Sequence, residues 1–365
     1  MIRVRKRHIG LLALMVGLGL GCAGVGKVRL DSAEVVGAGD FKLGYGQRAN
    51  REAAEYSEQL MFSGRFAAGG ALYLRLLITN LAGAAGRAEL LAVVTAPDGR
   101  RIQSRIRRKF GKWRHGKGEF DVQLGENRIA FEDGEAQITL RLPRIEADWT
   151  LTSGQPGFRP QGGSTRFGNN RYYQTTVVFA RGQIEGETRV DSGKENELAF
   201  DSEGVVYGEH RAGNVAPYVM SRRWIQVRDV GAERTFILSA FQRPKRLGGE
   251  VHAWMFVADD DGFLVYEPSI EIALSGFVRD EESGYDVPTH LSFKAGEETI
   301  GVVKGDEQVG RKDDLEGLGG LIRHVVSTFM RPFTFRYRTR YLVRRPLEGV
   351  ESFSGQAAYT YQQLN

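Results

Sequence analysis

Tyr207, Glu209 and His210 lie within four positions of one another and include this sequence's candidates for acid–base chemistry. Arg222 and Trp224 follow a short distance downstream. A carboxylate and an imidazole beside an aromatic ring could protonate an alkene as general acids. Glu209 and His210 are therefore the candidate catalytic residues.

The strand expected at these positions limits that chemistry. Consecutive side chains of a β-strand point to opposite faces, so Glu209 and His210 should not share one cavity. A structural interpretation stands beside the catalytic one: His210 forms a hydrogen bond inside the protein and Trp224 packs in the core. Contact with the polar part of a ligand is a third interpretation. No metal site is expected, because no H-x-x-x-H spacing occurs among the scattered His115, His252, His290 and His324.

The N-terminus has the layout of a secretory signal peptide. Four basic residues precede an apolar run over residues 9–20, and the small residues around Cys22 follow it. The apolar run is shorter than the roughly 20 residues that a helix needs to cross a bilayer. The four basic residues are Arg3, Arg5, Lys6 and Arg7.

Cys22 is the only cysteine of the 365 residues, and its setting resembles the lipobox of bacterial lipoproteins. That resemblance implies cleavage after residue 21 and lipidation of Cys22. Gly19 departs from the usual Leu, and Ala23 lacks the Asp associated with retention in the inner membrane. We expect an anchor in the outer membrane, facing the periplasm. An ordinary signal peptide with an incidental cysteine and an uncleaved anchor are the alternatives.

The charge balance argues against a nucleic-acid partner. Four of the 50 basic residues precede Cys22, so the remaining 46 nearly balance the 45 acidic residues. A polyanion-binding surface needs a clear basic excess. Because the single cysteine is assigned to the anchor, disulfides and thiol catalysis are not expected, and no cofactor is expected either.

Most of the chain after the signal reads as short strands separated by turns, which predicts an all-β fold. Two series of strands meet near Gly182, and we interpret them as two antiparallel barrels in tandem. One short helix is expected over residues 315–330, where apolar residues recur at helical spacing. The expected organisation is a signal peptide (1–21), a tether (22–37), an N-terminal barrel (38–182) and a C-terminal barrel (183–365).

Residues 333–344 (FTFRYRTRYLVR) alternate with a period of two, which separates a mostly aromatic face from a face rich in arginine. Phe335, Tyr337 and Tyr341 share one face with Phe333 and Val343, while the arginines share the other. Two interpretations are open. The arginines form a basic wall for a lipid headgroup, or the strand is half-buried and its arginines face water.

Residues 179–224 resemble the survival-factor family of double-lipocalin proteins. FARGQIEG, GVVYGEH and SRRWIQVRD follow one another in the order and spacing of that family, with Ala180 where the family often has Pro. FKLGY near the start and residues 353–362 near the end extend the resemblance. The wider relatives are carotenoid 1,2-hydratases and AttH-like proteins, whose Asp-bearing aromatic motif has only Glu209 as a loose substitute here.

The resemblance implies two lipocalin-like barrels with apolar cavities suited to lipids or isoprenoids. We therefore expect a membrane-anchored protein that binds or carries a hydrophobic ligand. An isoprenoid hydratase or cyclase-like enzyme is the alternative, and a structural envelope lipoprotein with fully packed barrels is the second. The candidate ligand-binding residues are Tyr207, His210, Arg222, Trp224, Phe236, Trp254, Phe335, Tyr337 and Tyr341.

Overall fold

The computed structural model describes most of the chain after the predicted signal peptide. The signal peptide, Cys22 and the helix expected over residues 315–330 lie outside the described residues. The described ranges are 28–30, 34–36, 41–81, 85–116, 120–155, 157–160, 164–167, 171–295, 299–314, 332–344 and 352–364.

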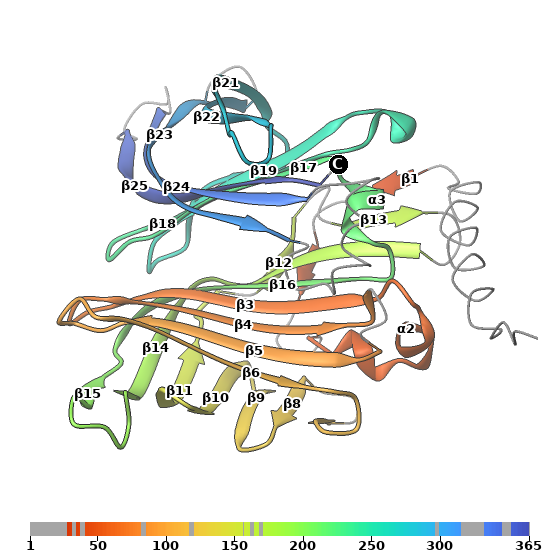
Figure 1. Cartoon of the computed structure of the whole chain (residues 1–365). Helices are drawn as coiled ribbons and strands as arrows, with labels where there is room; N and C mark the ends of the chain where they lie inside the picture. The colour runs from red at the N-terminus through yellow and green to blue at the C-terminus, as the bar shows by residue number, and fades with distance from the viewer. Residues whose placement is uncertain are drawn as a thin grey trace, which may run out of the picture.

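The described residues form two large antiparallel sheets, which confirms the all-β prediction (Figure 1). Two short α-helices occur among them, α2 (Arg48–Glu52) and α3 (Pro217–Met220), with the 3-10 turns η2 (Gly44–Gly46) and η4 (Lys245–Leu247). No helix in these ranges is long and apolar enough to span a membrane.

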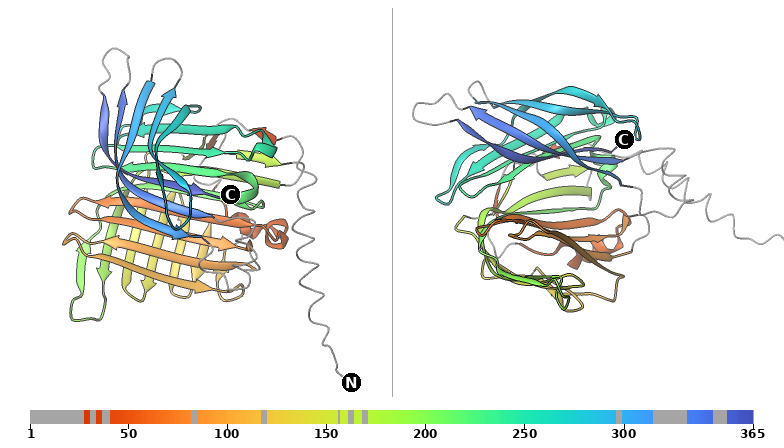
Figure 2. Two further views of the ribbon diagram at one scale, coloured as in Figure 1. Left: turned by 45° about the horizontal axis from the view of Figure 1, so that its top comes forward. Right: turned by 60° about the vertical axis from the view of Figure 1, so that its left-hand side comes forward.

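The first sheet curls into a barrel, with β6 approaching β10 and β11 (Figures 1 and 2). Its main path runs in the order β6-β5-β4-β3-β16-β14-β11-β10-β9-β8-β7. The bounds are β3 (Ser57–Phe66), β4 (Ala71–Thr79), β5 (Arg87–Thr95), β6 (Arg101–Arg108), β7 (Arg114–His115), β8 (Asp121–Leu124), β9 (Asn127–Glu132), β10 (Glu135–Leu142), β11 (Ile145–Thr152), β14 (Arg171–Val190) and β16 (Gly204–Gly213).

Five short strands join the first sheet off this path. They are β1 (Val28–Leu30), β2 (Glu34–Val36), β12 (Gly157–Arg159), β13 (Ser164–Phe167) and β15 (Leu198–Asp201). β1 pairs with β13 and β2 pairs with β12. These parts of the predicted tether are therefore strands of the first sheet, because their backbone groups complete antiparallel ladders.

The second sheet is curved and lies against the first, with β21 approaching β19 (Figure 2). Its order is β20-β19-β18-β17-β25-β24-β23-β22-β21. The bounds are β17 (Arg223–Val230), β18 (Thr235–Gln242), β19 (Val251–Ala258), β20 (Phe263–Glu267), β21 (Glu271–Arg279), β22 (Asp286–Ala295), β23 (Thr299–Asp313), β24 (Phe333–Arg344) and β25 (Phe353–Gln363).

The chain passes from the first sheet to the second between Gly213 and Arg223, through α3. The boundary predicted at Gly182 instead falls inside β14, where the register with β16 shifts. A Cβ on Gly182 would lie 2.5 Å from the carbonyl oxygen of Thr152 on β11. Gly182 therefore permits a close approach of neighbouring strands in an irregular ladder, and it does not mark a turn between domains.

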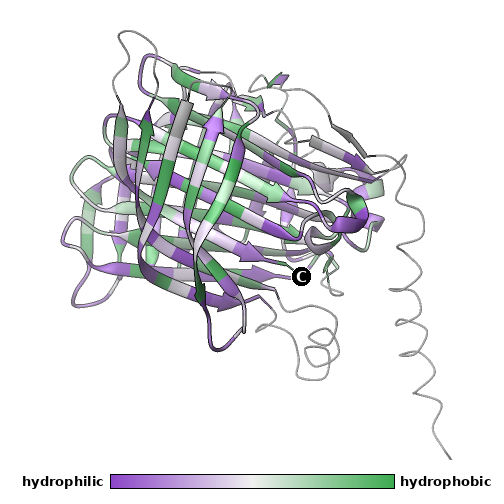
Figure 3. Cartoon of the chain, turned by 90° about the horizontal axis from the view of Figure 1, so that it is seen from above, coloured by the Kyte–Doolittle hydropathy of each residue, from purple (hydrophilic) through white to green (hydrophobic). Residues whose placement is uncertain are grey.

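Each sheet buries alternate side chains in its own core, and Figure 3 shows hydrophobic and hydrophilic residues alternating along the strands. Phe335, Tyr337 and Tyr341 of β24 lie in the second core as expected. On its outer face, Arg338 pairs with Glu307 and Arg340 with Asp306. The half-buried strand is confirmed, and these acidic partners on β23 interrupt the basic wall.

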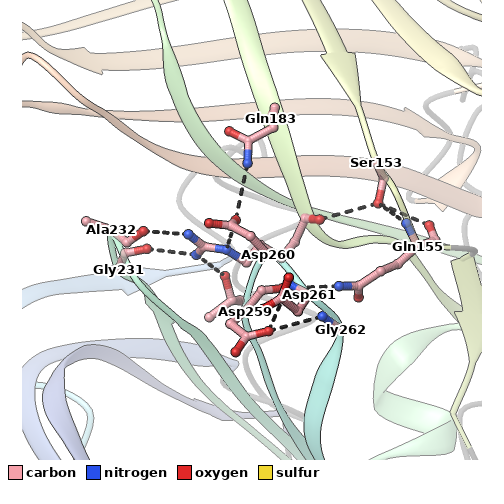
Figure 4. A network of polar contacts seen from close by, with 11 residues as sticks. Ser153, Gln155, Gln183, Gly231, Ala232, Asp259, Asp260, Asp261 and Gly262 are labelled. Carbon is pink, nitrogen blue, oxygen red and sulfur yellow. Dashed lines mark hydrogen bonds and ion pairs between the residues drawn. The ribbon is translucent and has the colours of Figure 1, made fainter.

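Arg181 of β14 fastens the two sheets together. Its side chain is 1% exposed, and its Nε donates to Asp260 Oδ1 at 2.7 Å. Its Nη1 donates to the Gly231 carbonyl at 2.9 Å, and its Nη2 donates to the Ala232 carbonyl. Figure 4 shows these acceptors, which come from two turns of the second sheet, gathered around the guanidinium.

We predict that Arg181→Met lowers the free energy of unfolding by about 3 kcal/mol, because two carbonyls and Asp260 lose the donors of a buried guanidinium. Chemical denaturation followed by circular dichroism measures the change. Arg338→Met, which removes one arm of an exposed ion pair, should change it by less than about 0.5 kcal/mol. Equal effects of the two substitutions would contradict the role of Arg181.

Candidate functional site

His210 and Glu209 point to opposite faces of β16, as predicted. His210 faces the interior of the first barrel, where its ring lies 4.8 Å from that of Phe41, edge to face. Glu209 faces the second sheet, where it accepts a hydrogen bond from Gln226 of β17. The two residues therefore belong to two separate polar clusters.

The partner of His210 is Glu58 of β3, a residue that the sequence analysis missed. His210 Nε2 lies 2.8 Å from Glu58 Oε1. Glu58 stands opposite Ala212, while His210 stands opposite Leu60, so the two residues are diagonal neighbours on adjacent strands. In the sequence, Glu58 is an acidic residue two places before Leu60, and alternate residues of a strand share one face. In the structure, both residues face the core of the first barrel.

Glu58 is a buried acceptor with four donors. The backbone N–H groups of Gly44 and Tyr45 and the Tyr56 hydroxyl each donate to it at 2.8 Å, in addition to His210. Burial alone would raise the pKa of Glu58, but the hydrogen bonds from His210, the Gly44 backbone and Tyr56 outweigh that effect and hold the pKa below its ordinary value. Glu58 is therefore an ionised carboxylate at neutral pH.

The ionised carboxylate fixes the tautomer of His210. A carboxylate only accepts, so His210 Nε2 carries a proton and donates it to Glu58. Within the described ranges, no hydrogen bond is formed by Nδ1. The carboxylate thus holds the imidazole in one orientation and leaves the second nitrogen for other chemistry, as in hydrolase triads.

A cavity of about 180 Å³ lies beside this pair in the first barrel. Thr176 of β14 lines the cavity and is the direct cross-strand partner of His210. Phe41 also lines it, and its ring covers the imidazole. The full set of lining residues is Val36, Phe41, Phe131, Gly134, Ser153, Gly154, Gln155, Gly157, Thr176, Val178 and Phe179.

Glu209 is the centre of a second cluster, between the two sheets. The Tyr207 hydroxyl donates to Glu209 Oε2 at 2.7 Å, Gln226 Nε2 donates to the same oxygen at 2.8 Å, and Arg211 Nε donates to Oε1. Burial and the adjacent Glu209 raise the pKa of Tyr207 well above its ordinary value, so the hydroxyl keeps its proton. This carboxylate is fully engaged in joining the sheets.

The other predicted ligand-binding residues are divided between the two faces of the second sheet. Trp224 and Trp254 lie between the sheets, and the guanidinium of Arg211 stacks 4.5 Å from the Trp224 ring. Phe236 lies in the core of the second sheet, where it stacks on Tyr341 at 4.4 Å.

Three further members of the predicted set lie outside the first-barrel cavity. Phe335 and Tyr337 belong to the second core, and Arg222 is half-buried, with its backbone paired to Gln242 and Leu364. None of the predicted residues lines the cavity. His210 alone stands directly beside it.

The described residues hold no cluster of three His, Cys, Asp or Glu side chains that could bind a metal ion.

No protein-family model and no curated protein sequence matches this chain. Solved structures are similar to it. CghA with Sch210972 has a TM-score of 0.57 at 12% identity, covering 86% of this chain and 89% of that one. Kievitone hydratase from Nectria haematococca has 0.53 at 11%, covering 91% and 97%.

A putative AttH from Nitrosomonas europaea has a TM-score of 0.54 at 13% identity, over 89% of this chain and 98% of that one. At these identities the similarity shows the fold. The chain has the lipocalin-type fold shared by AttH-like and hydratase proteins.

We predict that Glu58 contributes acid-sensitive stability. Its pKa is lower in the folded chain than in the unfolded one, so its contribution is full above about pH 4.5 and is lost as the pH falls through the folded value. Glu58→Gln should cost on the order of 3 kcal/mol at pH 7 and less at pH 3. Denaturant titrations at the two pH values measure the difference. The exposed Glu132→Gln should show no such trend, and a cost of Glu58→Gln that is independent of pH would refute the assignment.

Proposed function

We propose that this protein is an acid–base enzyme of the hydratase type that acts on a small, hydrophobic, unsaturated molecule in the first barrel. The observation that carries the proposal is the buried Glu58–His210 pair beside an apolar cavity. Perturbed, paired titratable groups at a cavity are typical of catalytic centres. The fold shared with kievitone hydratase supports the same class of reaction.

His210 is the proton-transfer group in this proposal, and Glu58 is a positioning residue. With its Nε2 proton held by Glu58, His210 uses Nδ1 to take a proton from the attacking water and then gives that proton to the other carbon of the double bond. The charge that develops on the imidazole is stabilised by the adjacent carboxylate at 2.8 Å. Water is thus added across the double bond, with its hydroxyl on one carbon and its proton on the other.

The substrate must displace Phe41 to reach His210. The Phe41 ring lines the cavity and meets the imidazole edge to face at 4.8 Å, and it also contacts Phe120 and Phe131. Phe41 precedes η2 and belongs to no strand, so no ladder hydrogen bonds oppose its movement. The aromatic rings would line the apolar body of the bound molecule.

Carriage of a hydrophobic ligand without chemistry is the second candidate function. It is favoured by a specific observation: Glu58 also binds the backbone of Gly44 and Tyr45 and so fastens the segment that closes the barrel. That structural role accounts for the buried pair without catalysis. In both proposals, the lipid anchor predicted at Cys22 would hold the protein at the cell envelope.

We predict that His210→Gln lowers hydration at least about 100-fold, since it removes the proton-transfer group. The assay incubates the full-length protein in detergent with a panel of isoprenoid alkenes and detects the gain of one water by mass spectrometry. His252→Gln, which changes a histidine of β19 that packs on Phe241 and does not line the cavity, is the matched control. Its activity should stay at the wild-type level.

Two results would overturn the hydratase proposal. Full activity of His210→Gln would remove the imidazole from the mechanism. A wild-type protein that binds members of the panel and hydrates none would favour carriage.

A further inference from the structure

The turn between β6 and β7 carries an exposed aromatic ring at its tip. Residues 109–112 form a β-turn, in which the Lys112 N–H donates to the Lys109 carbonyl at 3.0 Å. Gly111 has a φ of +79°, the left-handed conformation that a type II turn requires at this position. Phe110 therefore occupies the corner of the turn, where it is 58% exposed.

Two buried aromatic residues hold the Phe110 ring in this exposed position. Its centroid lies 6.2 Å from that of Tyr45 and 6.5 Å from that of Trp113. Trp113 Nε1 donates in turn to the carbonyl of Gly86, just before β5, at 2.8 Å. A single exposed apolar residue is common on protein surfaces, so its surroundings must indicate whether it has a partner.

Basic side chains surround the Phe110 turn. Those of the turn and of this end of the barrel are exposed and form no ion pair with a carboxylate of the described ranges. They are Arg51 of α2, Arg87 at the start of β5, Arg105 of β6, Lys109, Lys112 and Arg114 of β7.

Acidic residues near this end of the barrel are already paired with other arginines. Glu52 of α2 pairs with Arg48, and Glu55 pairs with Arg171 at 3.4 Å. Glu89 of β5 pairs with two arginines of the neighbouring strands. The unpaired basic side chains therefore give this end a positive surface, which attracts an anionic partner.

The start of the described chain lies at the same end of the first barrel. Val28 of β1 stands opposite Phe167, which stands opposite Arg171 at the beginning of β14. From there the register passes through the end of β16, the start of β3, the end of β4 and the start of β5 to Arg108 at the end of β6. Figure 1 likewise shows β1 and α2 on one side of the first sheet.

The lipid predicted at Cys22 would bring this end of the barrel close to a membrane. Cys22 precedes Val28 by six positions, which span at most about 22 Å when fully extended. The ten residues of β3 alone extend over roughly 33 Å. The end with Val28 and Phe110 would therefore be the nearer one to the bilayer.

We propose that the Phe110 turn docks the first barrel on an anionic lipid bilayer. The ring enters the boundary between headgroups and acyl chains, while Lys109 and Lys112 keep their ammonium groups among the anionic headgroups. The residues of the turn are all exposed and none of them lines the cavity, so a broad surface fits the turn better than a small ligand does. This docking goes beyond the proposed function, because it needs no chemistry in the cavity.

Quenching by brominated lipids tests whether the turn enters the bilayer. Phe110→Trp places a fluorescent reporter at the tip of the turn, and the native tryptophans are buried. The full-length protein is reconstituted with vesicles of phosphatidylcholine and phosphatidylglycerol, with and without bromine on the acyl chains. The fluorescence of Phe110→Trp should fall in the brominated vesicles, because bromine quenches on contact, whereas that of the wild-type chain should stay unchanged.

Phe277→Trp is the matched control for the position of the reporter. Phe277 of β21 is 53% exposed, but it lies on the second sheet. Its substitution should add fluorescence that brominated lipids leave unchanged.

The basic side chains are tested in the Phe110→Trp variant. Lys109→Gln together with Lys112→Gln should weaken docking about 30-fold, at about fivefold for each lysine, and the remaining quenching measures the docked share. Lys294→Gln together with Lys304→Gln removes the same charge from exposed positions of the second sheet and should leave the quenching as it was.

Two results would refute docking on an anionic bilayer. Quenching of Phe110→Trp no greater than that of Phe277→Trp would exclude insertion of the turn and favour an acidic protein as its partner. Quenching that the substitutions of Lys109 and Lys112 leave unchanged would exclude the attraction to anionic headgroups. Neither result bears on hydration in the cavity, so the proposed function is tested separately.

Discussion

The buried carboxylate of Glu58 is the constraint on which the first barrel depends. An ionised carboxylate away from water is very costly unless it is paired and hydrogen-bonded. Here the donors come from the segment before β3, from Tyr56 and from β16. One charge therefore fixes the segment with Gly44 and Tyr45 against the barrel wall. The same charge sets the tautomer of His210. The hydrogen bonds of Glu58 therefore both stabilise the barrel and orient His210.

The second sheet contributes to the first through polar contacts at their boundary. Arg181 satisfies two carbonyls of the second sheet, and Glu209 satisfies donors from both sheets. These buried groups are costly when left alone, so they favour one relative placement of the sheets. The turn that holds Gln155 belongs to this boundary. The cavity itself is lined by residues of the first sheet and its loops.

Alternation along single strands was the part of the structure that the sequence could predict. It placed Phe335 and Tyr341 in a core, and it placed Glu209 and His210 on opposite faces. Partners across strands could not be predicted in the same way. Glu58 and His210 are far apart in the chain, and their contact depends on the register of β3 with β16.

The positions of Gly182 and Trp254 show the same limit. Gly182 has the residue type of a turn, but it is needed for the close approach of Thr152 inside a long strand. Trp254 and Phe236 are both apolar residues of neighbouring strands, yet one faces the first sheet and the other faces the second core. Which face of a strand meets a second sheet is set by tertiary packing, on which a single sequence carries little information.

The central claim is that Glu58 holds the His210 proton on Nε2 and leaves Nδ1 for the substrate. The ¹⁵N chemical shifts of the His210 ring, assigned by comparison with His210→Gln, measure both nitrogens directly. We expect a protonated Nε2 and an Nδ1 resonance that moves when an isoprenoid alkene of the panel binds. A proton on Nδ1 with a bare Nε2, or an Nδ1 resonance unchanged by bound ligand, would contradict it.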